Sequence, residues 1–273
     1  MGAQEDLIKR LEQKAKWVRL QVFESTIRAG KGHLGGTFSC ADLLVTLYYG
    51  GIMKYDASNP KLPDRDRFLI GKGHACLALY HIWADLGILD PARLTEYGVD
   101  GGLGGQLDTS IPGAEHNTGS LGHVIGIGAG IALGAKLDGK DYRVYAMIGD
   151  AECDEGAIWE SAMFAARYRL NNLIGIIDRN RLSVTAVIEE DDGSGRLEDK
   201  FRTCGWESRV IDGHSIDAIL GALTDLGRVD RPLMIIANTV KGKGVSFMEN
   251  GIKWHHAIPS PEQIEQARKE LCG

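Results

Sequence analysis

A strand, helix and strand pattern over residues 144–180 constrains the fold more than any other part of this sequence. The apolar run Val144–Ile148 has the length and composition of a buried strand, and Leu173–Ile177 forms a second such run. Between them, residues 155–170 repeat apolar side chains at helical spacing. The expected buried stripe of this helix is Ile158, Trp159, Ala162, Met163, Ala166 and Leu170. Since a helical crossover joins parallel strands, we predict an α/β fold in which a parallel β-sheet is flanked by helices.

Polar residues follow both of these strands. Gly149-Asp150 comes directly after the first strand, and Asn180 follows the second. Carboxylate and amide oxygens at one edge of a parallel sheet, beside a helix N-terminus, suit a Mg²⁺ ion that bridges to a phosphate. The alternative is that Gly-Asp only ends a strand and Asn180 only caps a turn. The spacing of the pair, each after its own strand, favours the metal and phosphate site.

These residues also carry a resemblance to a known family. Gly149-Asp150 followed by Asn180 thirty residues later resembles the thiamine diphosphate motif, and ECDEGAIWESAMFAA resembles the transketolase branch. The resemblance implies a thiamine diphosphate-binding domain of the diphosphate (PP) type. It also implies that the side chains of Asp150 and Asn180 and the main-chain carbonyl of Leu182 hold Mg²⁺. Ala151 stands where the family has glycine; it keeps the amide that can contact a diphosphate oxygen but resists a positive φ.

Several glycine-rich turns extend the resemblance. His33 lies in GKGHLGG, His74 in GKGHA, and His255 in KWHH. The resemblance implies catalytic roles for these three histidines in binding substrate or shuttling protons, and it adds the glutamate Glu155. The implied cofactor contacts are His74, Gly119, Ser120, Leu121, Gly149, Asp150, Ala151, Asn180, Leu182 and His255. Glu155 has two interpretations: a family glutamate that links cofactor sites across an interface, or an acid favoured by a helix N-terminus.

Three positions depart from the family pattern. Gln106 lies near the place where the family has a histidine, His123 follows the TGxLG turn where better-known members have glutamine, and His256 replaces a glycine. The donor and acceptor substrates therefore stay open.

The composition agrees with one soluble α/β unit. A length of 273 residues suits a single α/β domain over 1–273, and no apolar run approaches the roughly twenty residues of a membrane span. The net charge of −6 argues against nucleic-acid binding. A charged N-terminal helix in place of a signal peptide, with five scattered cysteines, indicates a cytoplasmic protein.

Further elements follow from local patterns. We expect helices at 4–29, 37–49, from about 122, and at 261–271; strands at 67–70, 207–210 and 233–237; and a charged surface loop at 189–200.

The resemblance covers only the front part of a complete transketolase. It therefore implies that the pyrimidine-binding and C-terminal domains belong to a separately encoded partner chain, in an α2β2 assembly. The implied reaction transfers a two-carbon ketol unit from a ketose, usually phosphorylated, to an aldose. Two alternatives remain: a subunit of a thiamine diphosphate enzyme that uses a 2-keto acid donor, and a non-catalytic binding subunit. The numerous apolar and small residues in 98–130 and 152–170 predict a large interface with the partner.

Overall fold

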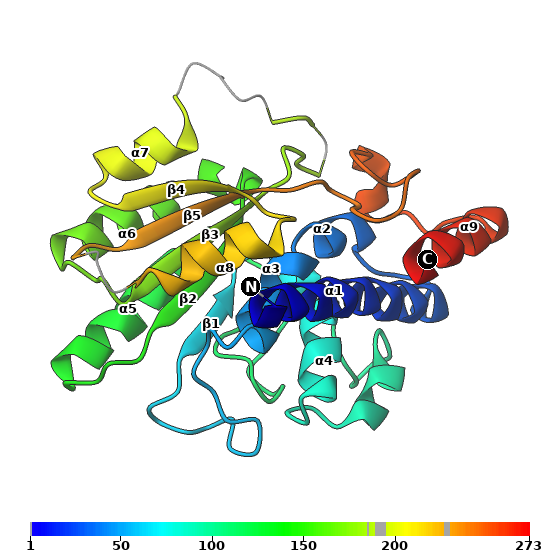
Figure 1. Ribbon diagram of the computed structural model, residues 1–273, viewed down its shortest axis with the longest axis horizontal. Helices are drawn as coiled ribbons and strands as arrows, with labels where there is room; N and C mark the ends of the chain where they lie inside the picture. Colours follow the sequence, from blue (N-terminus) through cyan, green and yellow to red (C-terminus); the bar gives the residue numbers. More distant parts are fainter. Residues whose placement is uncertain (1, 185, 189–194, 227–229) are drawn as a thin grey trace.

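A parallel β-sheet forms the centre of the molecule. The computed structural model describes residues 2–184, 186–188, 195–226 and 230–273. Within them, five parallel strands take the order β1-β2-β3-β5-β4 (Figure 1). The strands are β1 (Arg67–Ile70), β2 (Val144–Gly149), β3 (Leu173–Arg179), β4 (Glu207–Asp212) and β5 (Leu233–Asn238). The predicted α/β class and the strand, helix and strand unit are confirmed.

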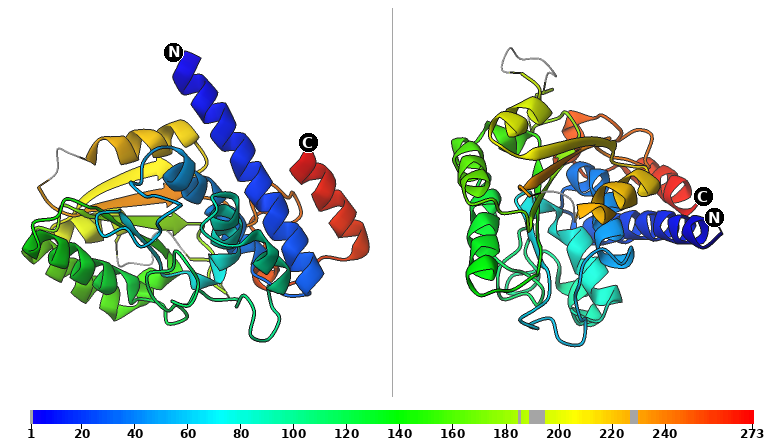
Figure 2. Two further views of the ribbon diagram at one scale, coloured as in Figure 1. Left: turned by 90° about the horizontal axis from the view of Figure 1, so that it is seen from below. Right: turned by 60° about the vertical axis from the view of Figure 1, so that its left-hand side comes forward.

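Helices cover both faces of this sheet (Figure 2). One side carries α1 (Gly2–Ala29), α2 (Leu34–Ser39), α3 (Ala41–Tyr49), α4 (Cys76–Asp85) and α8 (Ile216–Thr224), with α9 (Pro261–Cys272) packed against α1. The other side carries α5 (Val124–Leu137), α6 (Gly156–Arg167) and α7 (Leu197–Thr203). Short 3-10 turns, η1 (Gly73–Ala75), η2 (Pro91–Glu96), η3 (Ala151–Asp154) and η5 (Ile252–His255), lie between these elements.

The strands alternate their side chains between two buried clusters. In β2, Tyr145 and Met147 join the cluster beneath α1, α3 and α4, whereas Ala146 and Ile148 join the cluster beneath α5 and α6. A strand that is apolar on both faces is typical of a parallel sheet between two helical layers. This arrangement fixes the register of the strands, because a one-residue slip would exchange the two faces.

One predicted helix proved to be two. The expected helix over 37–49 begins earlier, as α2, and stops at Ser39 before α3 starts at Ala41. The Ser39 hydroxyl donates to the Asp178 carboxylate at 2.6 Å, and Cys40, with φ −95° and ψ 3°, makes the break. The break therefore places the last residue of α2 against Asp178, near the end of β3.

Two further predictions need correction. Met163 was expected in the buried stripe of α6, but it is 56% exposed, because the buried face consists of Ile158, Ala162 and Ala165. In the charged stretch 189–200, residues 189–194 lie outside the described residues, and the helix α7 replaces the expected loop from Leu197 onward. The buried side chain of Phe201 anchors that helix against the sheet.

Within the described ranges, no helix combines the length and the apolar character that a membrane crossing requires.

Candidate active site

The carboxyl ends of four strands supply the polar residues of one cavity. Lys72 and His74 follow β1, Asp150 follows β2, Asn180 follows β3, and Lys241 follows β5. The crevice at the carboxyl ends of the strands is where open α/β sheets bind ligands. The full lining is Gly36, Lys72, His74, Leu121, Gly149, Asp150, Ala151, Glu152, Asn180, Leu182, Ser183, Val184, Lys241 and His255.

Two of the three predicted metal ligands, Asn180 and Leu182, lie on either side of a sharp turn. Asp150 accepts hydrogen bonds from the backbone amides of Ala151, at 2.9 Å, and Arg181. The side-chain oxygen of Asn180 accepts from the Leu182 amide at 3.1 Å. Arg181, between them, has a φ of 61°, which is costly for a residue with a side chain. This turn brings Asn180 and Leu182 to the cavity that Asp150 also lines.

A lysine ammonium lies against the predicted main-chain ligand. Lys241 Nζ donates to the carbonyl of Leu182 at 3.3 Å and to that of Ser183 at 2.9 Å. Burial, and then the charge of Lys72, lower the pKa of Lys241 to about 8. The sequence did not single out Lys241 as a site residue. Only its place directly after a strand, in the segment that also carries His255, could have indicated the role.

Two carboxyl groups of this cavity hold their protons unusually well. Burial, and then the charge of Asp178, raise the pKa of Asp150 to about 6. Burial raises the pKa of Glu152 to about 7, although it accepts hydrogen bonds from the amides of Gly122 at 2.9 Å and Gly149 at 3.2 Å. Glu152 was also missed, and its only signal was an acid in the short turn after Gly149-Asp150. It ties the 118–122 turn to the end of β2.

A buried ion pair lies beneath the cavity. Lys72 Nζ contacts the Asp178 carboxylate, which also accepts from the hydroxyls of Ser39 and Thr239. Burial disfavours the charged form of both residues, but their mutual attraction and hydrogen bonds outweigh it. The pKa of Lys72 is therefore raised and that of Asp178 is lowered. Asn180 Nδ2 donates to the same carboxylate at 3.4 Å. The pair therefore helps to orient Asn180, although Lys72 was not predicted.

The donor set fits a divalent cation with a diphosphate. Asp150 is 5% exposed, and its raised pKa reflects a carboxylate whose charge is not fully compensated. The positively charged Lys241 ammonium donates to the Leu182 carbonyl, so a cation is already bound at this oxygen. Carboxylate, amide and carbonyl oxygens are the ligands that Mg²⁺ prefers, and two lysines provide charge for an anion.

The three predicted histidines converge. The ring centroids of His33 and His74 lie 5.1 Å apart, and each lies 5.3 Å from that of His255. Burial is the main reason that the pKa values of His33 and His255 fall to about 4 and about 3. The pKa of His74 is lowered well below its usual value by burial and then by the Lys72 charge. All three imidazoles are therefore neutral near pH 7.

Glycine permits this approach. A Cβ atom on Gly36 would lie 3.1 Å from His74 Nε2, and one on Gly35 would lie 3.1 Å from the Trp254 carbonyl. The two glycines at the end of GKGHLGG therefore allow α2 to lie close to the segments that carry His74 and His255.

Other predicted residues lie farther out. In the 118–122 turn Leu121 lines the cavity, whereas Gly119 and Ser120 are exposed and do not. Glu155 is exposed at the N-terminus of α6. Ala151 lies in η3 without a positive φ, so its backbone conformation does not require glycine.

The three departures from the family pattern have different positions. The side chain of Gln106 accepts from the Thr118 hydroxyl at 3.3 Å, beside Gly73. His123 is exposed, with a ring nitrogen 3.5 Å from the Ser120 hydroxyl. The ring of His256 lies 4.3 Å from that of His33.

A family model and two relatives match nearly the whole chain. Residues 11–272 match the family model described as transketolase, thiamine diphosphate binding domain. The chain is 37% identical over 266 residues to one of the subunits of apulose-4-phosphate transketolase from Phocaeicola vulgatus, covering 97% of this chain and 94% of that protein. It is also 37% identical over 271 residues to 6-deoxy-6-sulfo-D-fructose transketolase subunit SqwG of a Clostridium species, covering 96% of each.

Larger relatives match over part of their length. The crystal structure of transketolase from Campylobacter jejuni superposes with a TM-score of 0.89 and 28% identity, covering 97% of this chain and 43% of that chain. Human transketolase is 32% identical over 266 residues, and the chain spans 42% of it.

Proposed function

The chain belongs to the family of transketolase thiamine diphosphate-binding domains, and from this membership we propose that it is the diphosphate-binding subunit of a two-chain ketol transferase. The enzyme would move a two-carbon ketol unit from a ketose, or its phosphate, to an aldose or aldose phosphate. The observation that carries the proposal is one cavity that Asp150, Asn180 and Lys241 line together with His74 and His255. The ring of His33 lies beside those of the two histidines.

The metal would be Mg²⁺, held by the side chains of Asp150 and Asn180 and by the carbonyl of Leu182. Thiamine diphosphate, when bound, supplies the electron sink for breaking and making a carbon–carbon bond next to a carbonyl. Lys241, whose ammonium lies beside the Leu182 carbonyl, would supply positive charge for the diphosphate oxygens. The remaining proposed cofactor contacts are His74, Gly119, Ser120, Leu121, Gly149, Ala151 and His255.

The histidines would act on the sugar. A neutral imidazole donates a hydrogen bond at one nitrogen and accepts at the other, so His33, His74 and His255 can each hold a hydroxyl and move its proton. Their lowered pKa values keep one ring nitrogen of each free to accept at neutral pH. The three rings therefore orient the substrate and carry its protons.

The partner would be a separately encoded chain that carries the pyrimidine-binding domain, in an α2β2 assembly in the cytoplasm. This chain covers almost the full length of two relatives that are named as subunits, and this supports an enzyme made of two chains. We propose that residues 1–273 act as one cofactor-binding domain. Glu155, exposed at the start of α6, is available to another chain.

The test is reconstitution with a separately encoded chain that carries the pyrimidine-binding domain. The purified complex, with Mg²⁺ and thiamine diphosphate, is offered ketose phosphates, a 6-sulfonated ketose and a 2-keto acid in turn, with aldose acceptors. We expect ketol transfer from a ketose donor, and loss of cofactor binding in calorimetric titrations of Asp150→Ala and Asn180→Ala.

Three results would contradict the proposal. Turnover of the 2-keto acid alone would assign the chain to a different thiamine diphosphate enzyme. Cofactor binding without turnover of any donor would favour a binding subunit. Unchanged cofactor affinity in both variants would remove the metal assignment.

A further inference from the structure

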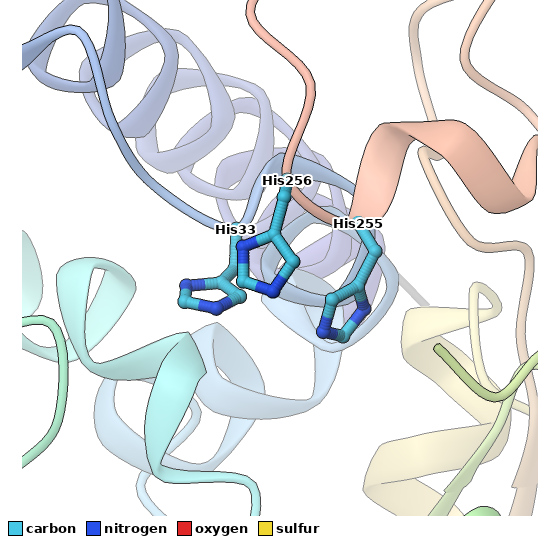
Figure 3. A group of neighbouring side chains, drawn as sticks. All are labelled: His33, His255 and His256. Carbon is cyan, nitrogen blue, oxygen red and sulfur yellow. The ribbon is translucent and has the colours of Figure 1, made fainter. Parts of the chain in front are cut away.

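Three histidines gather beside the cavity: His255 lines it, whereas His33 and His256 line a neighbouring hollow. His33 precedes α2, His255 ends η5, and His256 follows it (Figure 3). Their ring centroids lie 4.3 Å apart for His33 and His256, 4.7 Å for His255 and His256, and 5.3 Å for His33 and His255. Each offers a ring nitrogen, and these three atoms lie within 4.8 Å of one another.

The backbone around the three residues is well anchored. The His33 carbonyl accepts from both the amide and the hydroxyl of Thr37, at 3.2 and 2.6 Å. Trp254, next to His255, is 2% exposed and donates its indole N–H to the Phe247 carbonyl at 2.7 Å. The close approach of Gly35 to the Trp254 carbonyl joins the two segments. The imidazoles are therefore brought together by the fold and not by flexible ends.

Two of the rings have unmet bonding capacity. Among the described residues, the Nδ1 atoms of His33 and His255 are buried without a hydrogen-bond partner. A buried polar atom without a partner costs about 1–3 kcal/mol, so such atoms in a native fold call for an explanation. His256 is exposed and leaves the group open to solvent on one side.

Imidazole clusters of this kind select a particular class of metal. Neutral imidazole suits Zn²⁺, Cu²⁺ and Ni²⁺, whereas carboxylate and carbonyl oxygens suit Mg²⁺. Three histidines and a water form a common tetrahedral zinc site with Zn–N distances of about 2.0–2.1 Å, which requires nitrogens about 3.3 Å apart. Binding of such an ion would therefore require side-chain rotations that shorten the present nitrogen separations, which are all within 4.8 Å.

We propose that His33, His255 and His256 form a binding site for a late first-row divalent metal, with Zn²⁺ as its representative. This site is distinct in ligand chemistry from the oxygen ligands Asp150, Asn180 and Leu182. Because His33 and His255 also belong to the proposed substrate site, bound Zn²⁺ would compete with the sugar. That consequence rests on the proposed function, whereas the metal binding does not.

The test is a calorimetric titration of the full chain with Zn²⁺, in saturating Mg²⁺ and without thiamine diphosphate. We expect one Zn²⁺ per chain, with affinity reduced on the order of 100-fold or more in His256→Ala and in His33→Ala, since loss of even an outer partner of a ligand costs about 10–100-fold. Replacing Zn²⁺ by Co²⁺ should give the visible absorption of a tetrahedral site. The exposed His123→Ala and the oxygen-site Asp150→Ala serve as controls and should keep the Zn²⁺ affinity.

The outcomes separate the possibilities. Equal affinity in wild type, His256→Ala and His256→Asn would overturn the site, as would no Zn²⁺ binding by the wild type. Loss of Zn²⁺ in Asp150→Ala alone would assign the ion to the oxygen ligands and would also overturn it. Zn²⁺ binding without any ketol transfer would contradict only the proposed function. Ketol transfer that is insensitive to Zn²⁺, with no Zn²⁺ bound, would contradict only the metal site.

Discussion

Asp150 is the residue whose protonation governs the proposed metal site. Its pKa of about 6 lies above the ordinary value for an aspartate because the side chain is buried and faces Asp178. The unfolded chain gives up this proton at lower pH than the folded chain. Without a cation, this group therefore destabilises the fold increasingly as pH rises from about 4 to above 6. A bound divalent ion removes that penalty.

We therefore expect Mg²⁺ affinity in the presence of thiamine diphosphate to fall on acidification. The drop should approach about tenfold per pH unit below pH 6, because the proton and the metal compete for one carboxylate. Titration calorimetry at intervals of about one pH unit, from about pH 5 to about pH 8, measures it. Asp150→Asn, which has no proton to lose, should bind weakly with a flatter pH profile; an equally flat wild-type profile would contradict the assignment.

Lys241 gives a second prediction, with effects of opposite sign. Lys241→Met removes a positive charge and frees the Leu182 carbonyl, so Mg²⁺ alone should bind more tightly. The same variant should bind inorganic diphosphate more weakly, because it lacks the ammonium. Calorimetry with each ligand separately measures both effects.

Lys243→Met is the matched control for Lys241→Met. Lys243 is two residues away, and its side chain is 39% exposed and lies 3.9 Å from Glu249. This variant should leave both affinities near wild type. A parallel loss of both ligands in Lys241→Met would indicate a structural role for that lysine.

At the scale of elements, Gly36 in α2 allows the effect of side-chain packing on stability to be compared with that of helix propensity. Alanine at Gly36 would gain about 1 kcal/mol of helix propensity but would place a Cβ atom 3.1 Å from His74 Nε2. Overpacking of this kind costs about 1–3 kcal/mol. We expect Gly36→Ala to change the free energy of unfolding by less than about 2 kcal/mol, the difference between these terms, while turnover falls more strongly because His74 is displaced.

Gly130→Ala is the matched comparison for that prediction. Gly130 lies inside α5, and a Cβ atom added there would meet no atom within 4 Å. Alanine there should stabilise the isolated chain by about 0.5–1 kcal/mol. Denaturant unfolding and steady-state kinetics of the complex measure both variants; unchanged turnover in Gly36→Ala would show that His74 tolerates the shift.

Element periodicity predicted much of this architecture. The strands β1, β2 and β3 and the helix α1 were recognised because continuous apolar runs and a long amphipathic stripe leave little choice of structure. The break at Cys40 was not recognised, because it depends on a hydrogen bond from Ser39 to a carboxylate far away in sequence. Local patterns do not contain such a contact.

The same distinction applies to the candidate site. Asp150, Asn180 and the three histidines lie in short turns with recognisable residue types, and they do converge. Lys72, Glu152 and Lys241 were missed, because a lysine or glutamate in a polar turn is ordinarily solvated. Only the fold makes them 3%, 1% and 2% exposed.

For the whole molecule, α5 and α6 present an apolar outer surface. Met163 and Phe164 on α6 and Tyr168 directly after it are 56%, 40% and 46% exposed, and Leu137 at the end of α5 is 79% exposed. The rings of Phe164 and Tyr168 lie 4.6 Å apart. Adjacent exposed apolar side chains of this size commonly mark a protein interface.

We expect Phe164→Lys to weaken association of the chain with itself or with its partner, without loss of the fold. A charge at the centre of an apolar contact is left unpaired on association, whereas in the separate chain it is solvated. Size-exclusion chromatography with light scattering measures the association, and thermal unfolding checks the fold. Glu160→Lys, an exposed position of the same helix, is the control; equal assembly of both variants would exclude this surface.

The cavity proposed for the cofactor joins residues from nearly the whole length of the chain, from Gly36 to His255. Proteins are made from the N-terminus at about 5–20 residues per second, so the earliest and latest of these residues leave the ribosome many seconds apart. A chain that stalls before His255 lacks one wall of the cavity even if its sheet has formed. A chain would therefore bind thiamine diphosphate only after its synthesis has passed the last turn of the site. Incomplete chains would leave the cofactor free in the cell.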